Sequence, residues 1–386
     1  EKQSLPYLLP IAFFAQGARK QSPSIVIRRQ GIVFLLIFGK QVACNFVDGN
    51  NISDEEIADF KRELTEKNVV YYQIPFSRKI TDPKNYQCYK QLKQIVKQEK
   101  FSFIHCHTPI ASLIARLVGR STHTKVMYTA HGFHFFKGAP KKNWVLLYPA
   151  EWYASFMTDI LITINQEDYM RAKNHMHAKH TMYIPGVGIN LNKFGKVQID
   201  VKKKRSELNI PTDCTLLLSV GELNENKNHQ RVIHALTQLP ENVHYAIVGI
   251  DHLDGYNQKL AEELRVADRV HILGYRKDVS EIYAMSDIFV FPSYREGLSV
   301  SLMEAMATGL PCVVSKIRGN ADLIDGSRGE LFDPFSTESC LRAIRKVLDG
   351  DWASYKASNQ AFIQNFSLEA VMAKMKEIYS LIEKIK

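Results

Sequence analysis

Residues 287–319 read DIFVFPSYREGLSVSLMEAMATGLPCVVSKIRG, and this stretch decides the fold. A short apolar run at 288–291 leads through a loop with Pro, Ser and Gly into a helical pattern at 300–307, and a second apolar run follows at 312–315. Short β-branched and aromatic runs that alternate with helices are typical of βαβ units, in which the strands are parallel. The stretch therefore predicts a parallel sheet with a strand–loop–helix turn at its carboxyl edge.

The same alternation continues on both sides, in two series separated by a Gly- and Pro-containing connection at 185–211. The first series predicts strands at 69–74, 101–105, 125–129 and 160–164 and helices at 84–98, 110–119, 144–156 and 166–175. The second predicts strands at 215–220, 244–248, 270–273, 288–291 and 312–315 and helices at 228–239, 256–265, 279–284, 300–307, 337–348 and 368–385. We therefore expect an α/β protein of two doubly wound, Rossmann-like domains that face each other across a cleft. The expected domains are 1–190 and 191–366, with a C-terminal helix, 367–386, that packs back toward the N-terminal domain.

Composition narrows the class of protein. The chain has 386 residues, 45% hydrophobic and 23% charged, which excludes a disordered or fibrous protein and suits two domains. Six cysteines without a CxxC pair favour a reducing compartment over a disulfide framework or a structural zinc site. The apolar run at 32–38 is too short to span a membrane and predicts a buried strand, and no signal peptide is recognisable.

The net charge of +10 is concentrated in the first half of the chain. Residues 1–190 hold 25 Lys and Arg against 14 Asp and Glu, and the remainder holds 25 against 26. A basic half suits nucleic acid, anionic lipid or a phosphorylated substrate, and charge alone does not choose among them. The basic run at 202–205 is expected to be a solvated linker or helix face.

Two carboxylates flank the start of the predicted helix in the deciding stretch. Glu296 lies in the loop, and Glu304 follows eight residues later, one to two turns into the helix. Gly297 allows a ligand to approach the backbone closely, and the amides of Leu298 and Ser299 lie at the positive end of the helix, which suits a diphosphate. An ionised Glu304 only accepts hydrogen bonds and can take both hydroxyls of a ribose, while Glu296 can reach a sugar hydroxyl.

The pattern Pro-Ser-x-x-Glu-Gly-x6-Glu-Ala-Met-Ala-x-Gly-Leu-Pro-Cys-Val, at 292–313, resembles the retaining family 4 glycosyltransferases of the GT-B fold. The similarity continues in SVGEL at 219–223 with Lys227, in LGYR at 273–276 and in RGN at 318–320. In the first half, IHCHTP at 104–109 and YTAHGFHFFKG at 128–138 are similar to the bacterial exopolysaccharide and capsule branch of that family. The resemblance runs from about residue 69 to the C-terminus.

The resemblance implies a role for each site residue. It makes 1–190 the acceptor-side domain and 191–366 the nucleotide-sugar donor domain. Lys227 would hold the donor diphosphate, Glu304 the ribose, and Glu296 with the amides after it the donor sugar. His131 would lie over that sugar, so His131 and Glu296 are the candidate catalytic residues. The candidate donor-binding residues are Gly221, Lys227, Arg276, Gly297, Leu298, Ser299 and Glu304.

Plainer interpretations exist for several of these residues. Ser301-x-x-Glu304 could be a helix capping box, Lys227 a surface lysine, and His131 a structural histidine. His105 and His107 point to one face of a predicted strand, which could suggest a metal site. Because residues 101–150 contain no carboxylate, we expect core or acceptor-side histidines there instead.

Two features depart from the family pattern. Many members have Arg where this chain has Glu222, so we leave Glu222 out of the site. Residues 5–8, LPYL, are faintly similar to the family's acceptor-facing helix, but no clean strand precedes them. Basic residues interrupt the strand and helix expected near the N-terminus, namely Arg19, Lys20, Arg28, Arg29 and Lys40.

Together these observations predict a retaining glycosyltransferase of the hexosyl- or N-acetylhexosaminyltransferase type. The resemblance implies a UDP-sugar donor, a lipid-linked saccharide acceptor in exopolysaccharide or capsule synthesis, and neither a metal nor any other cofactor. Aromatic residues interleaved with lysines at 133–153 suit an anionic membrane surface, so we expect a cytoplasmic protein that is peripheral on the inner face of the bacterial plasma membrane. The alternatives are a non-catalytic nucleotide-sugar-binding protein and a UDP-sugar epimerase of similar fold. No nucleic-acid-binding module is recognisable, and no nucleic acid partner is expected.

Overall fold

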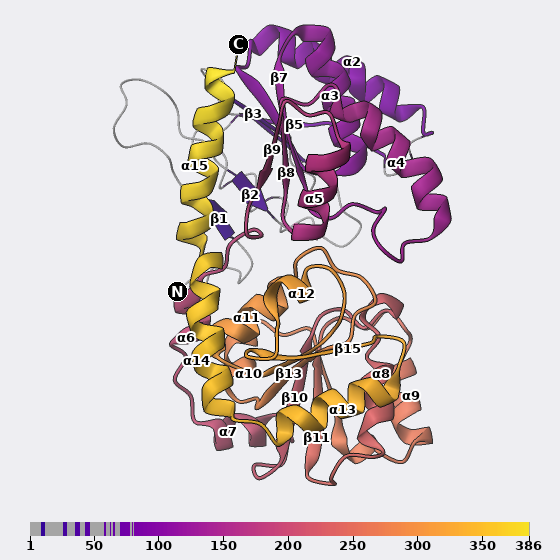
Figure 1. Cartoon of the computed structure of the whole chain (residues 1–386), viewed down its shortest axis with the longest axis vertical. Helices are drawn as coiled ribbons and strands as arrows, with labels where there is room; N and C mark the ends of the chain where they lie inside the picture. Colours follow the sequence, from indigo (N-terminus) through magenta and orange to yellow (C-terminus); the bar gives the residue numbers. More distant parts are fainter. Residues whose placement is uncertain are drawn as a thin grey trace. The chain divides into compact units, whose positions relative to one another are not determined.

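A computed structural model describes residues 70–77, 79 and 81–385, four short strands before them, and residues 58, 62 and 65. The chain divides into two compact units (Figure 1). Unit 1 comprises Glu1–Gly186 and Met372–Lys386, and unit 2 comprises Val187–Val371. Residues 5–8 and the basic residues Arg19, Lys20, Arg29 and Lys40 lie outside the described residues.

Unit 1 is built on a seven-stranded sheet in the order β5-β4-β3-β6-β7-β8-β9. Its strands are β3 (Leu35–Phe38), β4 (Ala43–Phe46), β5 (Val70–Gln73), β6 (Phe103–Cys106), β7 (Lys125–Ala130), β8 (Ile160–Thr163) and β9 (His180–Tyr183). β3, which lies in the predicted strand 32–38, is antiparallel to both its neighbours, and the other described strand pairs of this sheet are parallel. A separate antiparallel pair is formed by β1 (Leu9–Ile11) and β2 (Val26–Arg28).

The helices of unit 1 occur largely where the sequence pattern predicts them. They are α2 (Lys84–Glu99), α3 (Pro109–Thr122), α4 (Lys141–Ser155), α5 (Gln166–His175) and most of α15 (Leu368–Lys384). The C-terminal part of α15 packs on the interior strands β6 and β7 of this sheet, because the Tyr379 hydroxyl bonds His105 and the Lys125 ammonium bonds the Ile382 carbonyl at 3.2 Å.

Unit 2 contains a six-stranded parallel sheet in the order β12-β11-β10-β13-β14-β15. Its strands are β10 (Thr215–Val220), β11 (Val243–Val248), β12 (Val270–Gly274), β13 (Ile288–Phe291), β14 (Cys312–Ser315) and β15 (Gly329–Phe332). In order along the chain these are strands 3-2-1-4-5-6, the doubly wound arrangement. The order reverses between β10 and β13, so the loops after these two strands diverge at that point.

Helices cover both faces of the second sheet. α8 (Gln230–Leu236), α9 (Tyr256–Glu263) and α13 (Thr337–Leu348) bury apolar side chains in one core, and α10 (Val279–Ala284) and α11 (Val300–Thr308) lie on the other side (Figure 1). The remaining elements are α6 (Leu191–Gly195), α7 (Val201–Glu207), α12 (Asn320–Leu323), α14 (Trp352–Phe362) and three short 3₁₀ turns, η1 (Glu225–Lys227), η2 (Ala267–Arg269) and η3 (Ile363–Phe366).

The basic run at 202–205 lies in α7. Lys202 and Lys203 are exposed, as expected of a solvated helix face, whereas the Arg205 side chain is buried and corrects that expectation. Its guanidinium donates to the carbonyls of Met285 and Cys214 and pairs with Asp287 at 2.8 Å. Lys204 pairs with Asp278 at 2.6 Å, so Lys204 and Arg205 hold α7 against the rest of unit 2.

Candidate active site

The candidate site in unit 2 lies where the strand order reverses. The loop after β10 carries Lys227 in η1, and the loop after β13 carries Glu296 and leads into α11. Buried Asn228 ties the loops together, because its amide donates to the carbonyls of Pro292 at 3.0 Å and Pro334 at 3.1 Å. Ligands of doubly wound sheets bind at this edge.

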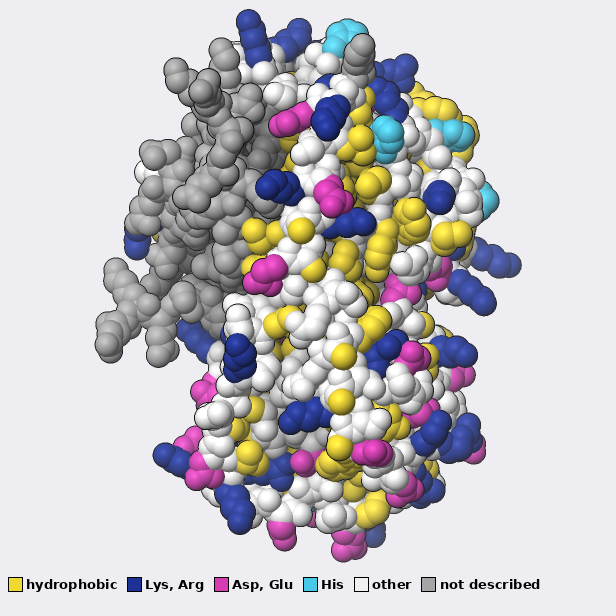
Figure 2. Space-filling view, turned by 60° about the vertical axis from the view of Figure 1, so that its left-hand side comes forward, with side chains coloured by type: hydrophobic (Ala, Val, Ile, Leu, Met, Phe, Trp, Pro, Cys, Tyr) yellow, Lys and Arg dark blue, Asp and Glu magenta, His cyan; other side chains and the backbone are white. Residues whose placement is uncertain are grey.

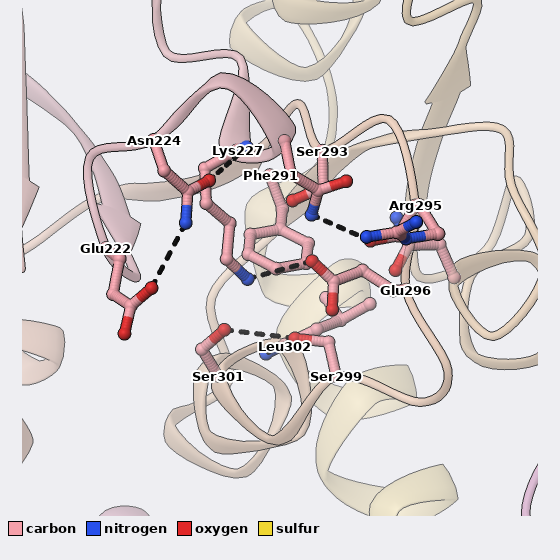
Figure 3. A network of polar contacts seen from close by, with 12 residues as sticks. Glu222, Asn224, Lys227, Phe291, Ser293, Arg295, Glu296, Ser299, Ser301 and Leu302 are labelled. Atoms are coloured by element: carbon pink, nitrogen blue, oxygen red, sulfur yellow. Dashed lines mark hydrogen bonds and ion pairs between the residues drawn. The ribbon is translucent and has the colours of Figure 1, made fainter. Parts of the chain in front are cut away.

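Lys227 and Glu296 meet directly. The Lys227 ammonium lies 2.8 Å from Glu296 Oε1 and 4.6 Å from the ring centroid of Phe291 (Figure 3). Asn224 fixes the start of the turn, since its side-chain oxygen accepts from the Lys227 amide at 3.0 Å. Gly221 gives the lysine room: a Cβ at Gly221 would lie 3.1 Å from Lys227 Cε.

The loop after Glu296 is held against the loop after β14. A Cβ on Gly319, whose φ is +77°, would lie 2.0 Å from the Gly297 carbonyl oxygen, so only glycine fits there. Arg318 Nε donates to the Glu296 carbonyl at 3.1 Å. These contacts fix the backbone that carries the first carboxylate.

The N-terminus of α11 is capped by Ser299. Its hydroxyl accepts from the Leu302 amide at 3.3 Å and lies 3.0 Å from the Ser301 hydroxyl (Figure 3). The capping-box interpretation of Ser301 with Glu304 is therefore wrong, because α11 begins at Val300 and Ser301 already lies in its first turn. Leu298 and Ser299 place their amides at the positive end of this helix, as the sequence predicts.

Glu304 lies in the second turn of α11 and is 5% exposed. The Tyr283 hydroxyl donates to Glu304 Oε2 at 3.1 Å. Burial raises the pKa of this carboxyl to about 7, although the Tyr283 hydrogen bond and the positive charge of Lys193 act in the opposite direction. Burial makes the charged form of this carboxylate costly, and a group that donates hydrogen bonds to it would offset that cost.

Arg276 and Glu222 are engaged elsewhere. Arg276, after β12, forms a two-point ion pair with Asp278, at 2.9 and 2.7 Å. Burial raises the pKa of Asp278, but hydrogen bonds from Arg276 and Lys204 outweigh this and hold it at about 2. The Glu222 carboxylate accepts from Asn224 at 3.1 Å and lies apart from Lys227 (Figure 3). Donor binding by Arg276 stays a prediction.

His131 belongs to unit 1, where it follows β7. Its Nε2 lies 3.1 Å from Nδ1 of His107, which follows β6. His105 precedes this pair and is buried, with Nδ1 3.0 Å from the Tyr379 hydroxyl and Nε2 2.8 Å from the Thr129 hydroxyl. His105 is thus a core histidine, one of the two alternatives that the sequence left open.

In the part of the chain that the structure describes, no group of three or more His, Cys, Asp or Glu side chains comes close enough to hold a metal ion. The expectation of metal-independent chemistry stays a prediction. Likewise, none of the described helices combines the length and apolar character needed to cross a bilayer.

Several contributors to the site were not predicted from the sequence. Asn228, Tyr283 and Arg318 act by holding loops or by bonding a carboxylate, and their partners are distant in sequence. Two signals were available: Arg318 stands in the RGN motif at 318–320, and the Asn-x-x-Lys spacing at 224–227 places an Asx cap on the turn that carries Lys227.

Comparison with known proteins shows which family the chain resembles. The family described as glycosyl transferases group 1 matches residues 200–365, and the family described as glycosyl transferase 4-like matches residues 55–165. A protein of Bacillus subtilis (strain 168) named as a glycosyltransferase, EpsD, is 35% identical over 320 residues, covering 80% of this chain and 84% of that protein.

Two further proteins extend the comparison. An Escherichia coli enzyme named UDP-Gal:alpha-D-GlcNAc-diphosphoundecaprenol alpha-1,3-galactosyltransferase is 27% identical over 301 residues, covering 75% of this chain and 77% of that enzyme. The crystal structure of HepE from Anabaena in complex with UDP and glucose has a TM-score of 0.70 at 19% identity, covering 83% of this chain and 89% of that one.

The fold is therefore that of the GT-B glycosyltransferases, with two parallel-sheet α/β units. The chain belongs to the GT4-like glycosyltransferases, in the group that includes bacterial exopolysaccharide enzymes. It is an enzyme of the transferase class.

Proposed function

We propose that this glycosyltransferase moves a sugar from a UDP-sugar to a lipid-linked saccharide and retains the configuration at the transferred carbon. The observation that carries the proposal is the Lys227–Glu296 ion pair beside the N-terminus of α11, with Glu304 buried one turn further on. A cation, free amides and a buried hydrogen-bond acceptor match a diphosphate next to a ribose. The E. coli relative is named for a UDP-sugar donor and a diphosphoundecaprenol-linked acceptor, and the HepE structure holds UDP.

In this proposal the Lys227–Glu296 ion pair opens when the donor binds. The diphosphate takes the place of Glu296 as the partner of Lys227, and the amides of Leu298 and Ser299 donate to its oxygens. Glu296 is then released to accept from a hydroxyl of the donor sugar. Glu304 accepts hydrogen bonds from both ribose hydroxyls, and these bonds offset the cost of burying its carboxylate.

Transfer proceeds on one face of the donor sugar. The bond between the anomeric carbon and the diphosphate oxygen breaks, and the acceptor hydroxyl forms the new bond on the same side. Its proton passes to the departing phosphate oxygen. Lys227 and the α11 amides stabilise the charge that develops on the diphosphate, which takes the place of a metal ion. His131 is the second candidate catalytic residue and acts on the transferred sugar.

The outward face of α4 supports a membrane-bound acceptor. Residues at helical spacing point outward and are exposed, and we call them the α4 surface: Val145, Leu146, Trp152, Tyr153 and Phe156. Trp144 and Tyr148 pack inward against the core of unit 1. On the face drawn in Figure 2, unit 1 also exposes hydrophobic side chains and histidines, among scattered acidic and basic side chains.

The charges around the α4 surface favour an anionic bilayer as its partner. Lys141 and Lys142 begin the helix and are exposed. The one acidic residue of α4, Glu151, is turned inward and pairs with buried Arg116 at 2.5 Å. Apolar and aromatic side chains flanked by lysines bind interfaces that carry anionic lipid. We propose that the protein works as a peripheral enzyme on the inner face of the bacterial plasma membrane.

The test is transfer to GlcNAc-diphospho-undecaprenol from UDP-galactose, UDP-glucose, UDP-GalNAc and UDP-GlcNAc in turn. We expect one donor to give a longer lipid-linked product whose new linkage has the α configuration by NMR. A β linkage would overturn the retaining mechanism. Isomerisation of a UDP-sugar without acceptor would indicate an epimerase, and UDP binding without turnover of any donor would indicate a non-catalytic binding protein.

A further inference from the structure

His107 lies beside the candidate catalytic histidine. β6 and β7 are neighbouring parallel strands, so the residues that follow them, His107 and His131, emerge at the same edge of the sheet. Nδ1 of His107 lies 3.1 Å from Nε2 of His131, and the two rings are nearly parallel at a centroid distance of 5.3 Å. Both side chains are half-buried.

The ring of His107 is itself supported. It lies 4.3 Å from the ring of His105, which is 1% exposed and is held at both nitrogens, by Tyr379 of α15 and by Thr129 of β7. Burial lowers the pKa of His105 well below its usual value, and the neighbouring histidines act in the same direction. His105 is therefore a buried, hydrogen-bonded support for the ring of His107.

A hydrogen bond between two imidazoles needs one N–H and one bare nitrogen. The contact therefore links the tautomer of His131 to that of His107, and it also fixes the plane of the His131 ring. Because His105 uses both nitrogens, the cluster does not present three histidine nitrogens to a metal ion. Two further titratable groups belong to neighbouring elements: Tyr379 of α15 bonds His105, and Asp168 of α5 accepts from the amide of Phe133, two residues after His131, at 2.9 Å.

We propose that His107 is a positioning residue for His131: it holds the ring and the tautomer in which His131 meets the transferred sugar. The proposal rests on the proposed function, since it assigns a task to His131. Nothing in it requires His107 to touch the substrate.

The matched test compares His107→Asn with His107→Gln in the full-length chain. The Asn amide can occupy the place of Nδ1, whereas the Gln amide reaches the place of Nε2, so the two variants have similar polarity but differ in the contact with His131. We expect H107Q and His107→Ala to lower kcat roughly 10- to 100-fold, with little change in KM for the UDP-sugar, and to shift the pH profile of kcat. We expect H107N to restore most of the activity and the wild-type profile.

A second measurement does not depend on turnover. Long-range ¹H–¹⁵N spectra of histidine-labelled protein report each tautomer, and His131→Asn identifies the His131 signals by their loss. We expect separated nitrogen shifts for His131 in the wild type and H107N, and averaged shifts in H107Q. Equal activity, equal pH profiles and equal spectra for H107N and H107Q would overturn the proposal. If H131N kept full transfer activity, the role of His131 in the proposed function would fail instead.

Discussion

The Lys227 ammonium and the Glu296 carboxylate form a 2.8 Å ion pair across the point where the strand order of unit 2 reverses. The two side chains neutralise each other's charge. In the proposed function, this ion pair opens when a donor binds. The two residues should consequently respond differently to the nucleotide alone and to the nucleotide-sugar.

For Lys227→Gln we expect UDP affinity to fall at least tenfold, because a charge-assisted contact to the diphosphate is lost. For Glu296→Gln we expect UDP to bind as tightly as in the wild type or more tightly, since Lys227 is no longer occupied, while transfer of the sugar falls. Calorimetry with UDP and a transfer assay measure the two effects. Lys259→Gln, on the exposed surface of α9, is the control and should change neither. A tenfold loss of UDP affinity in E296Q would contradict this account of the pair.

Burial of Glu304 predicts a pH dependence of stability. Its pKa is raised from 4.5 in the unfolded chain to about 7 in the folded one, so the native state keeps this proton longer. The stability associated with the protonated form is fully present below about pH 4.5 and is lost as the pH rises through 7, at a cost of about 3 kcal/mol. Glu304→Gln removes this titration.

We therefore expect E304Q to raise Tm at pH 8 and to leave it nearly unchanged at pH 5, as followed by calorimetry without ligand. The same substitution should weaken UDP binding by about 1–3 kcal/mol, because an amide accepts less well from two ribose hydroxyls. E296Q serves as the control, since Glu296 is paired with Lys227 rather than buried alone. Equal Tm changes at both pH values would argue against the raised pKa, and unchanged UDP affinity would remove Glu304 from the ribose site.

Membrane binding should depend on the α4 surface. Leu146 and Tyr153 are 68% and 55% exposed, and they lie on the same face of α4, two helical turns apart. We expect the wild type to co-sediment with vesicles that contain phosphatidylglycerol, and Leu146→Glu with Tyr153→Glu to reduce binding at least tenfold. Lys141→Gln with Lys142→Gln should weaken binding mainly at low salt, since exposed charges are screened. Ile250→Glu, an exposed apolar residue of unit 2, is the control. Equal binding of all four proteins would exclude α4 as the contact.

The alternation of apolar runs and helices was enough to predict the fold of both units, because buried parallel strands leave a clear local signal. Four elements were missed, because each is exposed in part or lacks strong periodicity: β9, β15, α12 and α14. The antiparallel direction of β3 could not be predicted, since strand direction depends on pairing rather than on residue pattern.

Within the site, the residues with a local signature were predicted and their supports were not. The Glu-x7-Glu pattern identifies Glu296 and Glu304, yet nothing local indicates that Lys227 pairs with Glu296 or that Tyr283 bonds Glu304. Charge patterning predicts a solvated helix face at 202–205, which holds for the exposed Lys202 and Lys203 but not for Arg205, because two of its three acceptors lie on a segment distant in sequence. The sequence pattern does not indicate contacts between segments that are distant along the chain.

Because Gly319 packs on Gly297, we expect a substitution at Gly319 to disrupt the site although no charged side chain is changed. A Cβ at Gly319 would lie 2.0 Å from the Gly297 carbonyl oxygen, and its φ of +77° is unfavourable for other residues. Gly319→Ala should therefore displace the loop that carries Glu296 and the α11 amides, lowering UDP affinity at least tenfold and Tm by several degrees. Gly326→Ala is the matched control, because a Cβ there meets nothing within 4 Å. Calorimetry with UDP and thermal unfolding compare the two variants, and wild-type UDP affinity in G319A would show that this loop does not position the donor.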